Sequence, residues 1–219
     1  MSKALGYAEE ARMIDRMPKI NYVQVRQKRL LWITKEEEQK VFKFLEAEGE
    51  SEFLRFVTIL LDTGMRPGEL MALAREDIDW DNNTILVYGA KTDKYRMLPM
   101  TGRVQQALKD QIGFYPSIHT QRPIDPTGRP GALFNFKYYT IQRLWMRVQK
   151  HMEWGVNAQH TLYVCRHTFA SRLVQADVPL PVITQLMGHS SYQQTLHYAK
   201  LSGDQGQAAI ATLEGLLGS

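Results

Sequence analysis

Hydrophobic residues recur at helical spacing along most of the chain, which predicts a mainly α-helical protein. Thr34 and Glu37 form a capping-box pattern, so we expect a helix to begin there and to run through KEEEQKVFKFLEA. The next segment, EFLRFVTILLDT, is apolar around most of its circumference, which is typical of a buried helix. Ser51 is expected to cap this second helix, and Gly64 to end it.

The pattern changes from helical to alternating after a short third helix. Pro67 suits the first turn of that helix, PGELMALA. Two segments, TILVYG at Thr84–Gly89 and RMLPM at Arg96–Met100, then have the composition of β-strands joined across AKTDKY, and DIDW adds a third strand before them. We therefore expect a small antiparallel sheet early in the chain.

Helical patterns dominate the remainder of the sequence. GRVQQALKDQI predicts a helix at residues 102–112, and residues 113–131, which hold four prolines and three glycines, predict a loop. Five further helices are expected at about 138–152, 164–176, 180–187, 191–199 and 206–217. The fold class predicted from these elements is α+β, mainly α with a small antiparallel β-sheet.

Composition limits the kind of protein. The chain has 219 residues, enough for one domain with an appendage, and its formal net charge of +4 favours a polyanionic partner without requiring one. A lone cysteine, Cys165, excludes an internal disulfide and a multi-cysteine zinc site and fits a reducing compartment. The longest apolar run, FVTILL, is too short to span a bilayer, and the N-terminus lacks a secretory apolar core. We expect a soluble, cytoplasmic protein with no membrane partner.

Several charged and polar residues stand in short, distinctive contexts. TGMRPGEL places Arg66 at a turn between two helices, and GAKTDKYRMLP places Lys91 at a hairpin tip, followed by Arg-x-x-Pro. YVCRHTFASRL places Arg166 near the start of a helix. LMGHSS contains His189, and Tyr198 lies nine residues after it. Each motif is weak alone, but their order makes the combination specific.

This order of Arg, Lys, Arg, His and Tyr resembles the catalytic domain of the tyrosine recombinases, the phage integrase family, from about Thr34 to the C-terminus. The resemblance implies a site-specific DNA recombinase of a phage or mobile element, acting near the nucleoid of a prokaryotic or phage-host cell. Such an enzyme cleaves and rejoins double-stranded DNA through a 3′-phosphotyrosine intermediate. It also implies four protomers on DNA, a monomer in isolation, and no metal or cofactor.

The resemblance assigns a role to each matched residue. Tyr198 matches the nucleophile, although a phenol with a pKa near 10 needs help to react at neutral pH. Arg66 and Arg166 match the pair whose guanidinium groups bind the non-bridging phosphate oxygens. Lys91 matches the general acid for the leaving 5′ oxygen. His189 matches the histidine that donates to a phosphate oxygen or positions the tyrosine.

Most of these residues also have a purely structural interpretation. Arg66 is well placed to bridge to Glu69, and both roles are compatible if Glu69 orients the guanidinium. Lys91 is at a hairpin tip where lysines are usually solvated, and Lys94 competes for its role. A histidine such as His189 is equally suited to close a turn between helices. For Arg166, its apolar neighbours predict a definite anionic partner.

One position departs from the family pattern. The family carries histidine, or sometimes lysine, three residues before the second arginine, where this chain has Tyr163. His160 lies six residues before Arg166 and is out of register, and the adjacent His167 has no matched role. Tyr163 is included in the candidate site because a phenol is able to donate to a phosphate oxygen, but it is a poor base at neutral pH. We therefore expect slower cleavage, limited by removal of the proton from the nucleophile.

Three other interpretations compete with the recombinase interpretation. A soluble helical interaction domain with no nucleic-acid role would leave the five ordered motifs to coincidence. A DNA-binding accessory module with the same fold and degenerate catalysis would explain Tyr163. A type IB topoisomerase shares the chemistry, but the short spacing from His189 to Tyr198 and the compact chain favour a recombinase.

The two ends of the chain carry further expectations. Residues 1–33 form a basic N-terminal segment, with Arg26, Lys28 and Arg29 close together, and are expected to be an interdomain linker left from a longer integrase. The alternative is a reduced form of the enzyme that depends on a partner. Residues 34–219 would be the catalytic domain. Within it, residues 206–219 carry apolar positions at helical spacing, which suit either docking on a neighbouring protomer or packing on the same domain.

Overall fold

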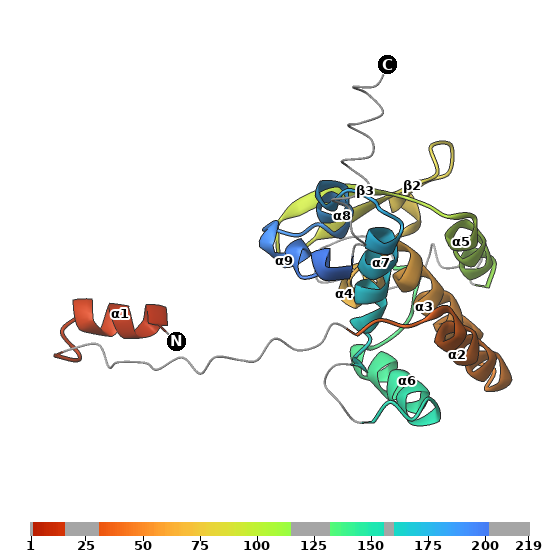
Figure 1. Ribbon diagram of the computed structural model, residues 1–219, viewed down its shortest axis with the longest axis horizontal. Helices are drawn as coiled ribbons and strands as arrows, with labels where there is room; N and C mark the ends of the chain where they lie inside the picture. The colour runs from red at the N-terminus through yellow and green to blue at the C-terminus, as the bar shows by residue number, and fades with distance from the viewer. Residues whose placement is uncertain (1, 16–30, 115–131, 156–159, 202–219) are drawn as a thin grey trace, which may run out of the picture.

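The computed structural model describes residues 2–15, 31–114, 132–155 and 160–201. Nine α-helices lie in these ranges (Figure 1). They are α1 Ser2–Glu10, α2 Lys35–Ala47, α3 Ser51–Thr63, α4 Pro67–Met71, α5 Gly102–Phe114, α6 Tyr138–His151, α7 Val164–Gln175, α8 Leu180–Met187 and α9 Gln193–Leu196. Two short 3₁₀ helices, η1 Arg75–Asp77 and η4 Ala199–Leu201, also lie in these ranges.

Three strands form one antiparallel sheet in the order β1-β2-β3. They are β1 Ile78–Asp79, β2 Thr84–Gly89 and β3 Lys94–Pro99. The pairing of β2 with β3 extends to the last residues before the turn, where Gly89 is opposite Lys94. For this reason β3 begins two residues earlier than the predicted Arg96. The mainly α fold with a small antiparallel sheet is confirmed.

The helix boundaries follow the predicted caps with one exception. At the start of α2 the Glu37 amide donates to Thr34 Oγ1 at 3.2 Å and the Thr34 amide donates to the Glu37 carboxylate at 2.8 Å, so the capping box is confirmed. Gly64 ends α3 in the left-handed conformation, with a φ of 63°. The prediction that Ser51 caps α3 is wrong, because Ser51 is already helical and Glu50 occupies the N-cap position.

Two predicted helices are shorter in the structure. Helix α4 stops at Met71 because the chain beyond it turns extended: the Leu133 amide donates to the Leu73 carbonyl at 2.8 Å, and Ala74 bridges Ala132. The helix expected at 191–199 is divided into α9 and η4, where hydrogen bonds of the i to i+3 type replace the α pattern. The helix expected at 206–217 lies outside the described residues.

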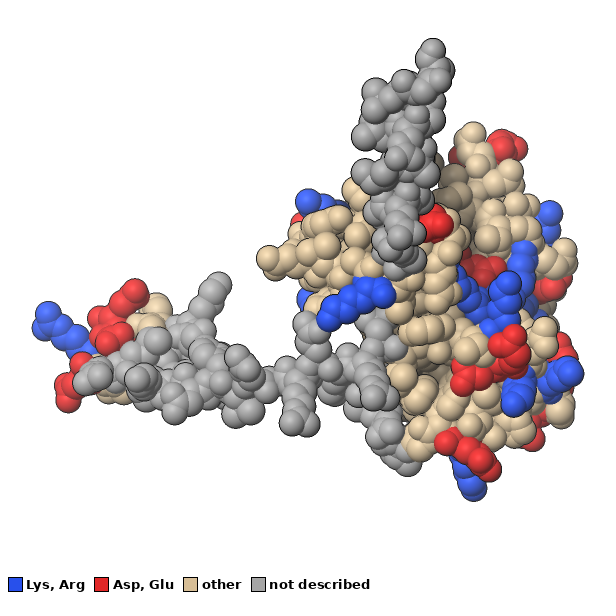
Figure 2. Space-filling view, in the orientation of Figure 1, with Lys and Arg blue, Asp and Glu red and all other residues tan. Residues whose placement is uncertain are grey.

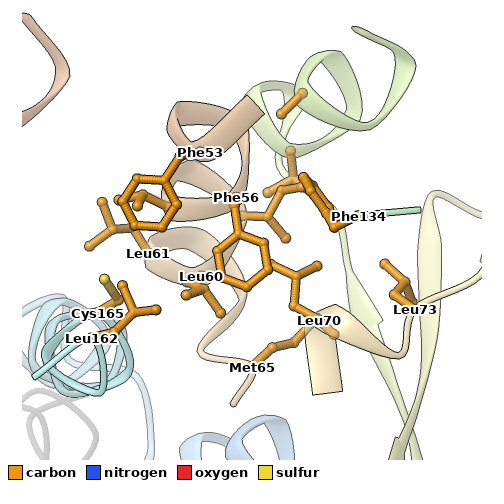
Figure 3. Close-up of a cluster of buried hydrophobic side chains, with 14 of the residues drawn as sticks. Phe53, Phe56, Leu60, Leu61, Met65, Leu70, Leu73, Phe134, Leu162 and Cys165 are labelled. Atoms are coloured by element: carbon orange, nitrogen blue, oxygen red, sulfur yellow. The ribbon is translucent and has the colours of Figure 1, made fainter. Parts of the chain in front are cut away.

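The hydrophobic core is built around α3, which is buried as its composition predicts. Figure 3 shows side chains of α3 facing Leu70 of α4, Phe134 in the segment before α6, and Leu162 and Cys165 at the start of α7. Phe56 packs edge-on against Phe134 with ring centroids 5.1 Å apart, and both rings are almost fully buried. Cys165 is fully buried in the same core, and burial raises the pKa of its thiol. This core holds the turn after α3 and the first turn of α7 in place.

The surface over α2, α3 and α5 carries Lys and Arg side by side with Asp and Glu (Figure 2). Beneath it, Arg103 binds the carboxylates of Glu38 and Asp62, and Arg172 of α7 binds Glu38 at 2.5 Å. Within the described ranges, no helix combines the length and the hydrophobicity needed to cross a membrane.

Candidate active site

Three segments that are distant in the sequence meet on one side of the sheet. The turn between α3 and α4 carries Arg66, the start of α7 carries Arg166, and the α8–α9 connection carries His189. Helix α7 packs against α3 and α8, and α8 packs against β3 (Figure 1). These contacts bring the predicted arginines and His189 into one cluster.

Glu69 organises two arginines at the edge of this cluster. Its carboxylate accepts from Arg66 Nη1 at 2.7 Å and from Arg96 Nη2 at 2.7 Å, and it also accepts the Arg66 backbone amide at 2.8 Å. Burial raises the pKa of Glu69, but the hydrogen bonds and charges of the two arginines outweigh it and lower the pKa overall. The predicted Arg66–Glu69 bridge is therefore confirmed, and it fixes the direction of the Arg66 guanidinium.

Arg96 was not assigned to the site from the sequence, although the Arg-x-x-Pro pattern after the hairpin marked its position. Its Nε donates to the Leu186 carbonyl at 2.9 Å, which ties β3 to the end of α8. Gly188 follows in the left-handed conformation with a φ of 60°, and a Cβ there would lie 3.0 Å from Arg96 Cδ. Both features favour glycine at this position, and the Arg96 bond to Leu186 anchors the end of α8 just before the turn that presents His189.

Arg166 is the most buried charged residue of the cluster, with 1% of its surface exposed. Its Nη1 donates to the Gly64 carbonyl at 2.6 Å, Nη2 donates to the Met187 carbonyl, and Nε is buried without a partner. The predicted anionic partner is absent among the described residues, because these backbone carbonyls take the place of a carboxylate. Burial lowers the pKa of Arg166 to about 10, and the charges of Arg66 and Arg96 act in the same direction.

A buried guanidinium held by neutral oxygens still carries its full charge at neutral pH. Carbonyl dipoles compensate that charge only partly, so an added anion would be bound favourably there. The electrostatic preference of the cluster is for an oxyanion.

His189 interacts with the same cations. Its Nδ1 lies 2.8 Å from Thr195 Oγ1, which fixes the ring after the Gly188 turn. Burial lowers the pKa of His189 to about 4, and the positive charges of Arg166 and Arg66 contribute to this shift. His189 is therefore neutral at pH 7 in the absence of an anion.

Tyr198 lies between α9 and η4 with 2% of its surface exposed. It packs in a second apolar cluster that contains Val174, Ile183 and Met187. Its hydroxyl is 2.6 Å from Nδ1 of His167, a residue to which the sequence assigned no role. Burial raises the pKa of Tyr198, and the charge of Arg166 opposes this shift.

Tyr163 occupies the position just before α7 and is 38% exposed. The Arg166 Cζ atom lies 5.9 Å from the centre of its ring, and the ring meets His167 edge-on at 5.5 Å. Tyr163 also raises the pKa of Arg66, after the larger effects of burial and Glu69. Its side chain therefore lies among the candidate residues, whereas His160 stacks on Trp154 with ring centroids 4.9 Å apart.

Lys91 is the one candidate that the structure leaves apart. It lies on the exposed turn between β2 and β3, and no hydrogen bond or ion pair within the described ranges joins it to the cluster. Lys94, the competing lysine, begins β3 and is also exposed. The cluster thus contains Arg66, Tyr163, Arg166, His189 and Tyr198 from the sequence prediction, together with Glu69, Arg96 and His167.

The chemistry available to the cluster is that of an anion site without metal ligands. In the part of the chain that the structure describes, no group of three or more His, Cys, Asp or Glu side chains is arranged to hold a metal ion. A pocket of about 540 Å³ adjoins Tyr163, but its lining, which includes Pro67, Ile141 and Trp145, contains no charged described side chain. An anion would therefore bind at the arginines rather than in this pocket.

Comparison with known proteins agrees with this arrangement. A putative integrase/recombinase, y4gC of Sinorhizobium fredii, is 29% identical over 160 residues, which cover 72% of this chain and 80% of the relative. The tyrosine recombinase XerA of Thermococcus onnurineus is 25% identical, with 97% of this chain and 72% of the relative covered. XerC of Corynebacterium glutamicum is 30% identical over 75% of this chain, but the match spans only 54% of XerC.

Solved structures show the same fold. The integrase of the Tn1549 transposon, in complex with a circular intermediate DNA, matches with a TM-score of 0.76 at 22% identity, covering 96% of this chain and 76% of the integrase. A crystal structure of XerA recombinase matches with a TM-score of 0.62 at 24% identity, covering 97% and 73% of the two chains. The model of the phage integrase family matches residues 31–204. The chain belongs to the phage integrase family and has the fold of a tyrosine recombinase catalytic domain.

Proposed function

We propose that this chain is a tyrosine-type site-specific recombinase that cleaves and rejoins double-stranded DNA through a phosphotyrosine at Tyr198. The observation that carries the proposal is the guanidinium of Arg166, which is buried beside Arg66 and Arg96 and whose hydrogen bonds within the described residues go to backbone carbonyls. Three arginines meet the carboxylate of Glu69 in this site, so a DNA phosphate would balance the remaining positive charge. DNA-bound integrase and XerH recombinase among the structural relatives support DNA as the partner.

In the proposed reaction, Arg66 and Arg166 bind the non-bridging oxygens of the scissile phosphate. Glu69 keeps Arg66 aimed at that phosphate, since it already holds the guanidinium and the backbone amide of this residue. Charge that develops on the phosphate oxygens is stabilised by fixed donors, so no metal ion is needed for this step. The negative charge of a bound phosphate would raise the proton affinity of His189, and the protonated imidazole would then donate a hydrogen bond to a phosphate oxygen.

Strand cleavage forms a bond between Tyr198 and phosphorus and breaks the bond to the 5′ oxygen. Lys91 would donate the proton to that leaving oxygen after DNA draws the hairpin turn towards the site. The phosphodiester energy is kept in the tyrosine ester, and a 5′ hydroxyl from the partner strand reverses the step. Because Arg166 and Tyr198 are both almost fully buried, DNA binding has to open the surface above them.

The proposal extends to domains and assembly. Residues 34–219 would form the catalytic unit, preceded by a basic linker, and would act as four protomers on DNA after existing as monomers in solution. The site would work on DNA in the cytoplasm of a prokaryote or phage host. The family match, which begins at residue 31, supports this division of the chain.

The test uses the full chain and a pool of nicked DNA duplexes with a randomised centre. Cleavage near the nick releases a short strand, so the covalent adduct accumulates and survives denaturation. We expect an adduct for the wild type and none for Tyr198→Phe, whereas Tyr192→Phe, at a tyrosine with 45% of its surface exposed, should retain it. The proposal would be refuted if the wild type formed no adduct with any duplex of the pool.

The burial of Tyr198 favours a second candidate function. A module that binds DNA through the arginines and never exposes its tyrosine would shift the mobility of the same duplexes without forming an adduct. The adduct assay and a native mobility assay on the same samples separate the two functions.

A further inference from the structure

The proton on the nucleophile has no acceptor at the position where the family pattern places one. That position is Tyr163, and a phenol is chemically a poorer base than the imidazole that the pattern has there. A phenol attacks a phosphate only when its proton is removed before or during the attack. The chemistry under Proposed function thus requires another acceptor within hydrogen-bonding reach of the Tyr198 oxygen.

His167 lies within hydrogen-bonding reach of the Tyr198 oxygen. Its Nδ1 lies 2.6 Å from the Tyr198 oxygen, and the two rings are 5.9 Å apart at their centres. It is placed one helical turn after Tyr163 on the first turns of α7, and Tyr163 supports its ring edge-on. The imidazole of His167 therefore lies next to Tyr163, the position at which the family pattern has its histidine.

The surroundings of His167 keep its imidazole able to accept a proton. Burial lowers its pKa, and the positive charge of Arg166 on the same helix lowers it further. From the other elements it faces Tyr163 before α7, Tyr198 between α9 and η4, and His189 after α8, on whose pKa it acts. A neutral ring with its proton on Nε2 accepts from the Tyr198 hydroxyl.

We propose that His167 is the catalytic residue that accepts the Tyr198 proton during strand cleavage and returns it during rejoining. This proposal rests on the proposed function. In cleavage the phenol proton moves to Nδ1 of His167, the Tyr198 oxygen bonds to phosphorus, and the 5′ oxygen leaves with a proton from Lys91. In rejoining the 5′ hydroxyl attacks the phosphotyrosine, its proton returns to Lys91, and the departing phenolate recovers its proton from His167.

A purely conformational role would give the opposite result. If the hydrogen bond only kept Tyr198 docked in its apolar cluster, loss of His167 would free the phenol and speed adduct formation. If His167 takes the proton, its loss slows adduct formation even though the phenol is freer. The sign of the rate change therefore separates the two roles.

The experiment measures single-turnover adduct formation by the full chain on a duplex selected from the randomised pool. His167→Gln keeps a polar group of similar size on α7 but is not a base, and His167→Ala removes the group. His151→Gln is the matched control, because His151 lies at the exposed end of α6, stacked on Phe44 with ring centroids 4.2 Å apart. Thermal unfolding and DNA mobility shift report whether each variant folds and binds.

We expect both His167 variants to form the adduct about 100-fold more slowly, with DNA affinity changed less than about threefold, and His151→Gln to match the wild type. The wild-type rate should be level from pH 7 to pH 9, where His167 is neutral. The His167→Gln rate should rise about tenfold per pH unit, because only the small phenolate fraction reacts. A substrate with sulfur as the 5′ bridging atom, which leaves without a proton, should rescue Lys91→Met but not His167→Gln.

Two results would overturn the inference while the proposed function stands. In the first, Tyr198→Phe abolishes the adduct but His167→Gln forms it at the wild-type rate or faster. In the second, the pH profile of adduct formation by His167→Gln is the same as that of the wild type. Absence of the adduct in the wild type would remove the proposed function and the inference together.

Discussion

Helix α7 carries two arginines that meet opposite environments. Arg172 binds the carboxylate of Glu38 at 2.5 Å, and Glu38 is shared with Arg103, which also binds Asp62. Arg166, less than two turns earlier, is more deeply buried, and in the described part of the chain it is hydrogen-bonded by backbone carbonyls and by no carboxylate. The first arrangement neutralises its charges within the protein and needs nothing further. The second leaves a positive charge for a ligand to neutralise, and this difference distinguishes a structural ion network from an anion site.

The largest effect is expected for Arg166→Met. An apolar side chain of comparable length removes the buried charge, so adduct formation should fall by about 100- to 1000-fold. Because the charge has no carboxylate partner within the described residues, the free energy of unfolding should fall by less than about 2 kcal/mol. Adduct kinetics and urea unfolding measure the two quantities. A fully active Arg166→Met protein would contradict the distinction between the two arginines.

Tyr163→His tests which residue on the first turns of α7 handles the proton. Alone, this change should alter the rate of adduct formation by less than about threefold, because His167 already accepts the proton. In the His167→Gln background it should restore about tenfold, because an imidazole then stands at the family position. A single-turnover comparison of the four proteins measures the coupling, and equal effects in both backgrounds would show that the two positions are independent.

Glu38→Gln tests the structural network. Glu38 is buried and accepts from Arg103 and Arg172, so replacing its charge should lower the free energy of unfolding by about 1–3 kcal/mol. Adduct formation, measured well below the unfolding temperature, should stay within about twofold of the wild type. Glu46→Gln, at an exposed position on the same helix, is the control. If Glu38→Gln lost activity without losing stability, the network would belong to the functional site.

A further effect is expected in the pH dependence of stability. The folded-state pKa of His189 is about 4, against an ordinary value near 6.5, so the unfolded chain binds a proton at intermediate pH that the folded chain does not. Stability should therefore be unaffected by this group above about pH 6.5 and should fall as the pH drops from there towards 4. His167 and His160, whose pKa values are also lowered, act in the same direction.

His189→Gln should flatten part of this decline, as measured by urea midpoints at several pH values between 7.5 and 4.5. A decline of equal steepness in the variant would mean that folding does not lower the pKa of His189.

Local chemistry explains why much of the fold was predictable. The capping box at Thr34, the apolar circumference of α3 and the Gly64 terminus depend on residues within a few positions of one another, and the structure confirms all three. The predicted end of α4 was wrong because of a contact with a distant part of the chain. Helix α4 ends early because its next residues pair with residues 132–133, a partner that no short window contains.

The candidate site divides in the same way. Motifs and their order, read through the family resemblance, identified Arg66, Arg166, His189 and Tyr198, which the structure then brings together. They did not identify the contacts of Arg96 with Glu69 or of His167 with Tyr198, which join residues 27 and 31 positions apart.

By itself, the sequence determined the kind of elements, the buried helix and the residue types able to bind a phosphate, because periodicity, capping and side-chain chemistry act over short distances. Only the tertiary structure decided which arginine lacks a carboxylate and which histidine reaches the phenol. Those properties depend on the packing of α3, α7, α8 and β3 around one another, and a change of about 1 Å there is enough to make or break each hydrogen bond.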